Sequence, residues 1–112
     1  MDQQRRQFFR VEYPVEERPK FLWKKKEYEV VDVSEMGIRF VCPRINPLEL
    51  EKIVRGNVIF EDGESYEVSG DVVRYQNEMI ALRLYEGPPY SKIVSEQRRL
   101  HQKYPRLFGL EE

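Results

Sequence analysis

Six short runs of β-branched and aromatic residues, separated by turn residues, occupy most of this 112-residue chain. Short strands at this spacing favour a closed or nearly closed antiparallel barrel. The expected strands span 18–23, 28–33, 38–42, 57–60, 65–75 and 79–84. We therefore expect a mainly-β protein with a single hydrophobic core, because a chain of this length has room for little more.

Turn residues mark several of the expected boundaries. Asp62-Gly63 lies between two strand-like runs, which is a good hairpin signal. Gly70 falls inside the longest run, where a glycine indicates a bulge or a bend. After a loop bracketed by two prolines, residues 48–54 are expected to form one or two helical turns.

A break at Gly87-Pro88-Pro89 separates the strands from a C-terminal segment with helical periodicity, which Pro105 stops. We expect an amphipathic helix within 88–105 that docks on the barrel as a lid or side brace. Its inward positions are expected to be Tyr90, Ile93, Val94, Gln97, Leu100, His101 and Tyr104. Its mostly outward positions are expected to be Lys92, Arg98, Arg99 and Lys103. Such a charged outer face is usually only solvated, and partner binding is the alternative.

Composition argues against several classes of function. The formal net charge of −1 disfavours a general nucleic-acid binder, which usually carries a basic excess. Cys42 is the only cysteine and His101 the only histidine, so Cys/His zinc sites and histidine-based triads are nearly excluded. No apolar run approaches the roughly 20 residues of a membrane span, and the N-terminus lacks a signal-peptide core. We expect a reduced, cytoplasmic protein without membrane insertion and without DNA or RNA as a partner.

The N-terminal residues 1–16 are expected to form an extended or loosely structured arm. Within it Arg6 and Arg10 stand at RxxxR spacing, and Arg5 lies just ahead of them. A guanidinium group can chelate a phosphate, pair with the O6 and N7 edge of guanine, or stack on a base. A basic N-terminus alone is more often simply solvated.

A second stretch, residues 32–37, carries Asp32, Ser34 and Gly37 at DxSxxG spacing where a strand runs into a turn. These residue types favour turns, because Asp and Ser bond to the backbone and Gly supplies a positive φ. They also suit a ligand: Asp32 can accept from guanine N1–H and N2–H₂ or orient an arginine, and Ser34 can donate. Ser34 is not a credible nucleophile, since no G-x-S-x-G elbow surrounds it. We expect no enzymatic activity.

Taken together and in this order, the arginine arm, the DxSxxG stretch, the six strands and the C-terminal helix resemble the PilZ domain. PilZ domains are bacterial receptors for the second messenger cyclic di-GMP, and the resemblance covers about 5–104. It implies one domain over 1–112, with a flexible ligand-binding arm (1–16), a six-stranded antiparallel barrel (17–86), a C-terminal α-helix (88–105) and a tail (106–112). It implies cyclic di-GMP as ligand and no further cofactor.

The resemblance also implies a set of ligand-binding residues: Arg5, Arg6, Arg10, Asp32, Ser34, Gly37 and Arg74. In the family the RxxxR arginines bind phosphate and guanine, and the second motif faces a guanine base from the barrel surface. An arginine at the position of Arg5 is associated with a stacked, intercalated pair of ligand molecules. Arg74 lies where the family can offer a side chain to stack on a base.

Two positions depart from the usual family pattern. Met36 stands where a second glycine often precedes Gly37, and Ala81 stands where the last strand often has a glycine. Neither change removes a side chain that would contact the ligand, although Ala81 could slightly crowd an approach to the backbone.

The expected function is that of a cyclic di-GMP receptor in motility or biofilm regulation. The ligand would order the arm over the barrel and change the interaction with an unknown downstream protein. The alternative is a ligand-independent adaptor for a motility or envelope component, because many PilZ-like domains lack the arginines. A single-stranded nucleic-acid binder is a third possibility, which the net charge disfavours.

Overall fold

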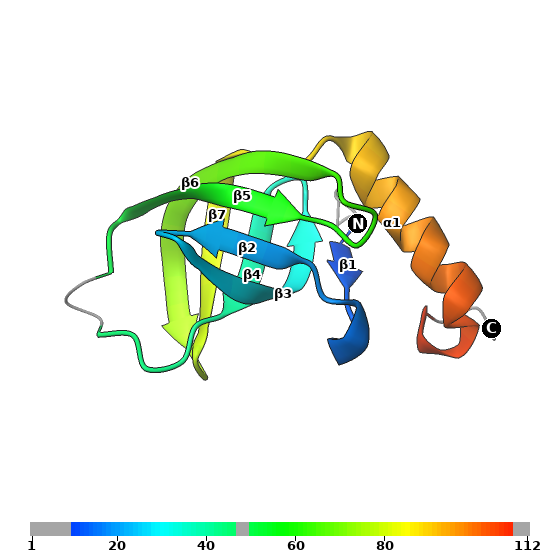
Figure 1. The fold of residues 1–112 in the computed structure, drawn as a ribbon, viewed down its shortest axis with the longest axis horizontal. Coiled ribbons are helices and arrows are strands. Elements are labelled where there is room, and N and C mark those ends of the chain that lie inside the picture. Colours follow the sequence, from blue (N-terminus) through cyan, green and yellow to red (C-terminus); the bar gives the residue numbers. More distant parts are fainter. Residues whose placement is uncertain (1–9, 47–49, 109–112) are drawn as a thin grey trace, which may run out of the picture.

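The computed structural model describes residues 10–46 and 50–108, which form a closed antiparallel barrel of six strands with one strand and one α-helix outside it (Figure 1). The expected six-stranded, mainly-β barrel with a C-terminal helix is confirmed. The barrel strands are β2 (Lys20–Trp23), β3 (Lys26–Ser34), β4 (Gly37–Val41), β5 (Ile53–Ile59), β6 (Ser65–Gln76) and β7 (Met79–Glu86). The other elements are β1 (Arg10–Glu12), a 3₁₀ turn (Val15–Glu17), α1 (Tyr90–Lys103) and a second 3₁₀ turn (Pro105–Phe108).

The barrel closes because β3 pairs with β2 on one edge and with β4 on the other. The order around the barrel is β2, β5, β6, β7, β4 and β3, and all pairs are antiparallel. Closure removes the free edges that an open sheet would offer to other chains. Asp32 and Val33 of β3 pair with β4 and also with β1, so β1 lies on the opposite edge, in line with β2. The segment of expected arm at 10–12 is therefore a strand fixed to the barrel.

Aromatic side chains fill the barrel around Phe40. This residue is fully buried, and its ring centroid lies 4.7 Å from Phe21, 5.7 Å from Tyr28 and 6.0 Å from Trp23. Tilted and edge-on contacts at these distances are favourable geometries for aromatic pairs. Three alternating residues of β7 are also buried, namely Ile80, Leu82 and Leu84.

Two glycines lie where neighbouring strands come too close to admit a side chain. A Cβ on Gly56 would lie 2.3 Å from the carbonyl oxygen of Leu22 and 2.8 Å from the Phe21 ring. A Cβ on Gly70 would lie 2.3 Å from the carbonyl oxygen of Arg83, and the register of β6 against β7 shifts at this glycine. The bulge expected at Gly70 is confirmed, and both glycines allow the strands to approach closely.

The helical turns expected at 48–54 are wrong for the part of that segment that the structure describes. Ile53 and Val54 open β5 and pair with Asp71 and Gly70 of β6. These β-branched residues gain cross-strand contacts and burial from pairing, which overrides a weak local helical pattern. The first two residues of the segment lie outside the described part of the chain.

Helix α1 runs beside the barrel at the end where β1 lies (Figure 1). Ile93 and Leu100 are fully buried, as expected, but Tyr90 is 51% exposed and its expected inward position is wrong. The final turn closes with a hydrogen bond from the Tyr104 amide to the Leu100 carbonyl, just before Pro105. Within the described ranges, no helix combines the length and apolar content that a membrane crossing requires.

Lys92 reverses the expected orientation of the charged helix face. It is only 4% exposed, and its Nζ lies 2.7 Å from Asp62 Oδ2 and 2.8 Å from Glu64 Oε1. The same ammonium group lies 4.8 Å from the centroid of the Phe60 ring. Burial lowers the pKa of Lys92, but its bonds to the two carboxylates outweigh that effect and raise it overall. The buried ammonium group of Lys92, paired with two exposed carboxylates, therefore fastens α1 to the β5–β6 turn.

Candidate ligand-binding site

Five of the seven expected ligand-binding residues line one pocket of about 200 Å³. They come from four strands: Arg10 from β1, Asp32 and Ser34 from β3, Gly37 from β4 and Arg74 from β6. Arg5 and Arg6 lie outside the described residues. The RxxxR and DxSxxG stretches are thus brought together through Arg10, whose Cα is paired with that of Ser34.

A row of opposed residues across four strands explains how distant segments meet at this pocket. Asp32 on β3 is paired with Arg39 on β4. Arg39 is paired with Ala81 on β7, and Ala81 is paired with Arg74 on β6. Directly opposed residues share one face of a sheet, and four strands about 4.8 Å apart place the ends of the row about 14 Å apart. The small Ala81 therefore leaves space between two arginines.

Asp32 is held by Arg39, a residue that the sequence analysis did not single out. Asp32 is 4% exposed, and its Oδ2 accepts hydrogen bonds from Arg39 Nε at 2.9 Å and Nη2 at 2.6 Å. The hydrogen bond with Asp32 raises the pKa of Arg39. Asp32 thus orients an arginine, one of the two roles considered for it, while its Oδ1 receives no bond from that arginine. Counting across the turn between the two expected strands would have placed Arg39 opposite Asp32.

The turn between β3 and β4 places the Ser34 hydroxyl beside the pocket. Its Oγ accepts a hydrogen bond from the Met36 amide at 3.2 Å, as expected of a serine in a turn. Gly37 does not have the expected positive φ; among the described glycines that conformation belongs to Gly63. A Cβ there would make only ordinary contacts, 3.4 Å from the carbonyl oxygen of Leu82 and 3.8 Å from Ser34 Oγ, so neither φ nor space requires a glycine at this position.

The pocket lining carries a net positive charge. Its charged side chains are three guanidinium groups, on Arg10, Arg39 and Arg74, and one carboxylate, on Asp32, which gives a formal charge of +2. Arginine forks recognise planar anionic groups and stack on aromatic faces, so this lining suits an anionic ligand with a flat ring. Within the described ranges, no cluster of His, Cys, Asp or Glu could hold a metal ion.

The segment that follows Arg10 is tied to α1 through Tyr13. The Tyr13 hydroxyl donates to Glu96 Oε1 at 2.7 Å, and both side chains are buried. Burial, followed by the neighbouring Glu96 carboxylate, raises the pKa of Tyr13, which keeps the phenol protonated as a donor. The strand that presents Arg10 is thus joined to the helix by a hydrogen bond that is shielded from water.

Glu17 makes a second connection between the 3₁₀ turn and α1. It is 4% exposed and accepts hydrogen bonds from Arg99 at 2.8 Å, Lys103 at 2.7 Å and Tyr104 at 2.8 Å. The bonds from Arg99 and Lys103 lower the pKa of Glu17 to about 2. A buried carboxylate with three donors anchors the C-terminal half of the helix to the segment between β1 and β2.

Known proteins provide an independent comparison. A family model of the PilZ domain matches residues 4–101. Among solved structures, the chain is similar to the Bacillus subtilis inhibitor of motility (MotI/DgrA), with a TM-score of 0.63 and 15% identity over 92% of this chain and 54% of that one. The chain thus spans about half the length of that protein, and at this identity the likeness concerns the fold alone. A search of curated proteins found no match. Because the family model covers most of its length, this chain belongs to the PilZ domain family.

Proposed function

We propose that this protein is a bacterial cytoplasmic receptor for cyclic di-GMP that acts through a downstream protein rather than as an enzyme. Cyclic di-GMP is the ligand associated with the PilZ family. The observation that carries the proposal is that Arg10, from the first motif, meets Asp32 and Ser34, from the second, at one pocket. The formal charge of +2 on the lining complements the two phosphates of the ligand.

The size of the pocket suits one base rather than the whole ligand. Its volume of about 200 Å³ lies below the roughly 300–1,000 Å³ of most small-molecule sites. In the proposed pose, guanine N1–H and N2–H₂ donate to Oδ1 of Asp32, the oxygen that Arg39 leaves open, and Arg74 stacks on the ring. The phosphates then lie outside the pocket, where the arginines of the N-terminal arm would bind them.

Ligand binding would be transmitted through the segment that follows the arm. The ligand would draw the arm across the barrel face, because it binds the ordered arm more tightly than the free arm. The arm continues into β1, and Tyr13 and Glu17 beyond it hold α1. The combined surface of arm and helix is what the downstream protein would recognise. Motility is the first process to examine, since the similar solved structure is an inhibitor of motility.

Calorimetric titration of the full chain with cyclic di-GMP tests the proposal. We expect saturable binding that Arg10→Ala and Ser34→Ala each weaken by about tenfold or more. Arg98→Ala, on the exposed face of α1, removes one arginine that does not line the pocket and should bind as the wild type does. Undiminished affinity in both pocket variants would reject the proposal. The same titration gives the stoichiometry, and it therefore shows whether one ligand molecule binds or the stacked pair that is associated with an arginine at the position of Arg5.

A ligand-independent adaptor for a motility or envelope component is the second candidate. The Asp32–Arg39 pair favours it, because this pair gives the buried carboxylate a cationic partner without any ligand. The adaptor would capture its partner equally with and without cyclic di-GMP, and Arg10→Ala would not change that capture. A partner interaction that depends on the nucleotide would exclude this candidate.

A further inference from the structure

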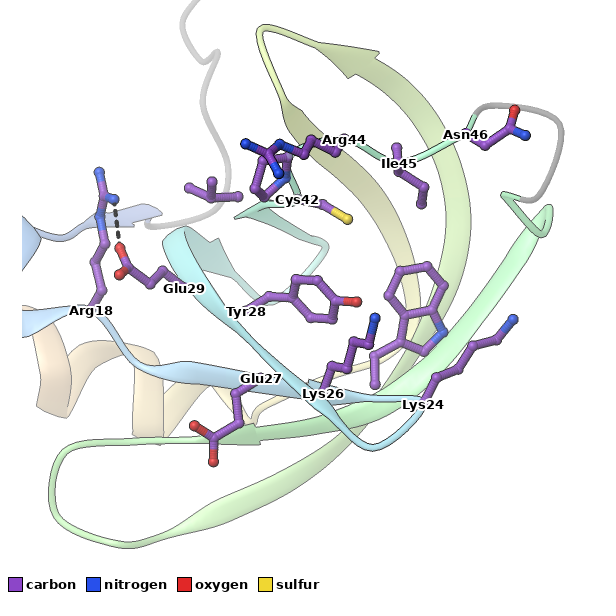
Figure 2. Close-up of a pocket in the computed structure, with 13 residues that line it drawn as sticks. Arg18, Lys24, Lys26, Glu27, Tyr28, Glu29, Cys42, Arg44, Ile45 and Asn46 are labelled. Carbon is purple, nitrogen blue, oxygen red and sulfur yellow. Dashed lines mark hydrogen bonds and ion pairs between the residues drawn. The ribbon is translucent and has the colours of Figure 1, made fainter.

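A larger pocket, of about 700 Å³, lies at the other end of β3 and β4 (Figure 2). The proposed cyclic di-GMP pocket is lined by the C-terminal end of β3 and the first residues of β4. The larger pocket is lined by residues 26–29 of β3 and residues 41–46, at and beyond the end of β4. The two pockets share no lining residue. A molecule bound in this larger pocket would therefore contact none of the residues that line the proposed cyclic di-GMP site, and its recognition would not depend on that site.

The wall of this pocket is apolar and aromatic. Trp23 is 5% exposed and lies against Tyr28, with a centroid distance of 5.7 Å. Ile45 and the buried Cys42 also line the pocket, and Ile45 packs against the core. Burial raises the pKa of the Cys42 thiol, so the thiol stays protonated and is a poor nucleophile. The pocket is built for contact with an apolar group rather than for covalent chemistry.

The rim of the pocket is basic. Its cations are Arg18, Lys24, Lys26 and Arg44, and its carboxylates are Glu27 and Glu29. Arg18 is paired with Glu29 at 3.1 Å, and Lys24 with Glu51 at 3.3 Å, outside the lining. Lys26 and Arg44 form no ion pair with another described residue. In Figure 2 the Lys26 side chain and the Tyr28 ring extend into the same space, whereas Glu27 points away from it.

Two basic residues of the lining, Lys24 and Arg44, and the neighbouring Lys25 have a backbone conformation that L residues rarely adopt. Lys24, Lys25 and Arg44 have φ values of 53°, 67° and 63°. The turn between β6 and β7 has similar values at Asn77 and Glu78, so the turn type alone is not distinctive. Asparagine and glycine suit such turn positions best, but here Lys24 and Lys25 occupy the turn between β2 and β3, and Lys24 adds its charge to the rim. Unfavourable backbone geometry of this kind is often retained where it serves function.

We propose that this pocket binds an acidic segment of a partner protein, with one apolar side chain seated against Trp23 and Tyr28 and its carboxylates paired with Lys26 and Arg44. The side chains of Lys24, Lys26 and Arg44 are exposed around the buried Trp23, which suits a segment lying across an open rim better than an enclosed small molecule. Tryptophan, tyrosine and arginine are the residues that dominate protein–protein hot spots. Lys26 and Arg44, which form no ion pair with another residue in the described part of the chain, select for negative charge in the partner.

Trp23 provides a direct test, because it is the only tryptophan of the chain. The probes are synthetic peptides in which a central Leu or Phe is flanked by Asp and Glu, and matched peptides flanked by Lys. With the full chain, selective tryptophan emission should change saturably with the acidic peptides and remain unchanged with the basic ones. The affinity for the acidic peptides should fall as salt is added, since charges on an exposed rim are screened.

Charge-reversal variants test whether the acidic peptides bind at this pocket. Lys26→Glu and Arg44→Glu each change an exposed residue and should each weaken the acidic peptide by about tenfold or more. Arg98→Glu makes the same change of charge on the outer face of α1 and should have no such effect. Arg10→Ala should also leave peptide binding intact. Equal binding of acidic and basic peptides, an equal loss in Arg98→Glu, or no loss in either rim variant would overturn the proposal. Saturation by free aromatic carboxylates but by none of the peptides would overturn it as well.

Discussion

Arg39 places two nitrogens of its guanidinium group, Nε at 2.9 Å and Nη2 at 2.6 Å, on the same carboxylate oxygen of Asp32. The carboxylate is almost fully buried, whereas about a third of the arginine side chain is exposed. The pair therefore connects a buried anion on β3 to a cation at the pocket surface. Both bonds end on Oδ2, so Oδ1 receives no bond from Arg39.

Arg39→Ala should lower both stability and ligand affinity, because it leaves the buried carboxylate of Asp32 without its main donor. We expect a loss of about 1–3 kcal/mol in the free energy of unfolding, towards the lower end because solvent screens the half-exposed arginine. Arg39→Lys should restore part of the stability but less of the affinity, since an ammonium group lacks the planar fork. Urea unfolding and calorimetry with cyclic di-GMP measure the two effects. Full affinity in Arg39→Ala would show that the ligand does not need an oriented Asp32.

The sequence locates most of the barrel strands, because alternation along a strand is a local property. The same holds for the Asp32–Arg39 contact, which follows from counting back across a short turn. The sequence misses β1, which lies in the expected loose arm, and the start of β5, which lies in the expected helical turns. The pairing of Ala81 with Arg74 depends on the order in which the strands close the barrel, and on a register shift between β6 and β7. No local pattern encodes that order. The family resemblance, rather than the residue pattern, is what pointed to Arg74.

The inward face of α1 cannot be predicted from apolar periodicity alone. The pattern places Tyr90 inside and Lys92 outside, and the structure reverses them. Lys92 is buried because the turn between β5 and β6 supplies Asp62 and Glu64 as partners. A periodicity argument counts apolar side chains and does not include charges contributed by a distant segment. Polar contacts therefore determine how this helix docks.

Gly56→Ala is expected to destabilise the barrel by about 1–3 kcal/mol or more, the usual cost of overpacking. The new methyl group would lie 2.3 Å from the carbonyl oxygen of Leu22 and 2.8 Å from the Phe21 ring, and backbone cannot move aside as a flexible side chain can. Gly37→Ala is the control for stability, because its nearest contact of 3.4 Å is ordinary. Urea unfolding compares the two variants. Equal stabilities would mean that β2 and β5 can separate without cost.

Glu17 should make the docking of α1 sensitive to acid. Its pKa is about 2 in the folded protein against an ordinary value of 4.5. The folded state thus binds fewer protons than the unfolded one, so the stabilisation is complete above pH 4.5 and is lost as the pH falls towards 2. The free energy of unfolding should therefore be higher for the wild type than for Glu17→Gln at about pH 7. This difference between the two proteins should become smaller at about pH 3. Urea unfolding at both pH values provides the comparison, and a difference independent of pH would exclude an ionised Glu17 as the anchor.

Ala81→Val should change ligand binding with little change in the stability of the fold. Ala81 lies between Arg39 and Arg74 on the outer face of the barrel, where a β-branched residue suits a strand. We expect stability to change by less than about 1 kcal/mol, since the site is at the surface. The added methyl groups should fill the space proposed for the base and weaken cyclic di-GMP by about tenfold. Ala81→Gly, which introduces the residue common here in the family, should bind at least as well as the wild type. Calorimetry on both variants, with urea unfolding as the check on folding, decides the matter: unchanged affinity in Ala81→Val would place the base elsewhere.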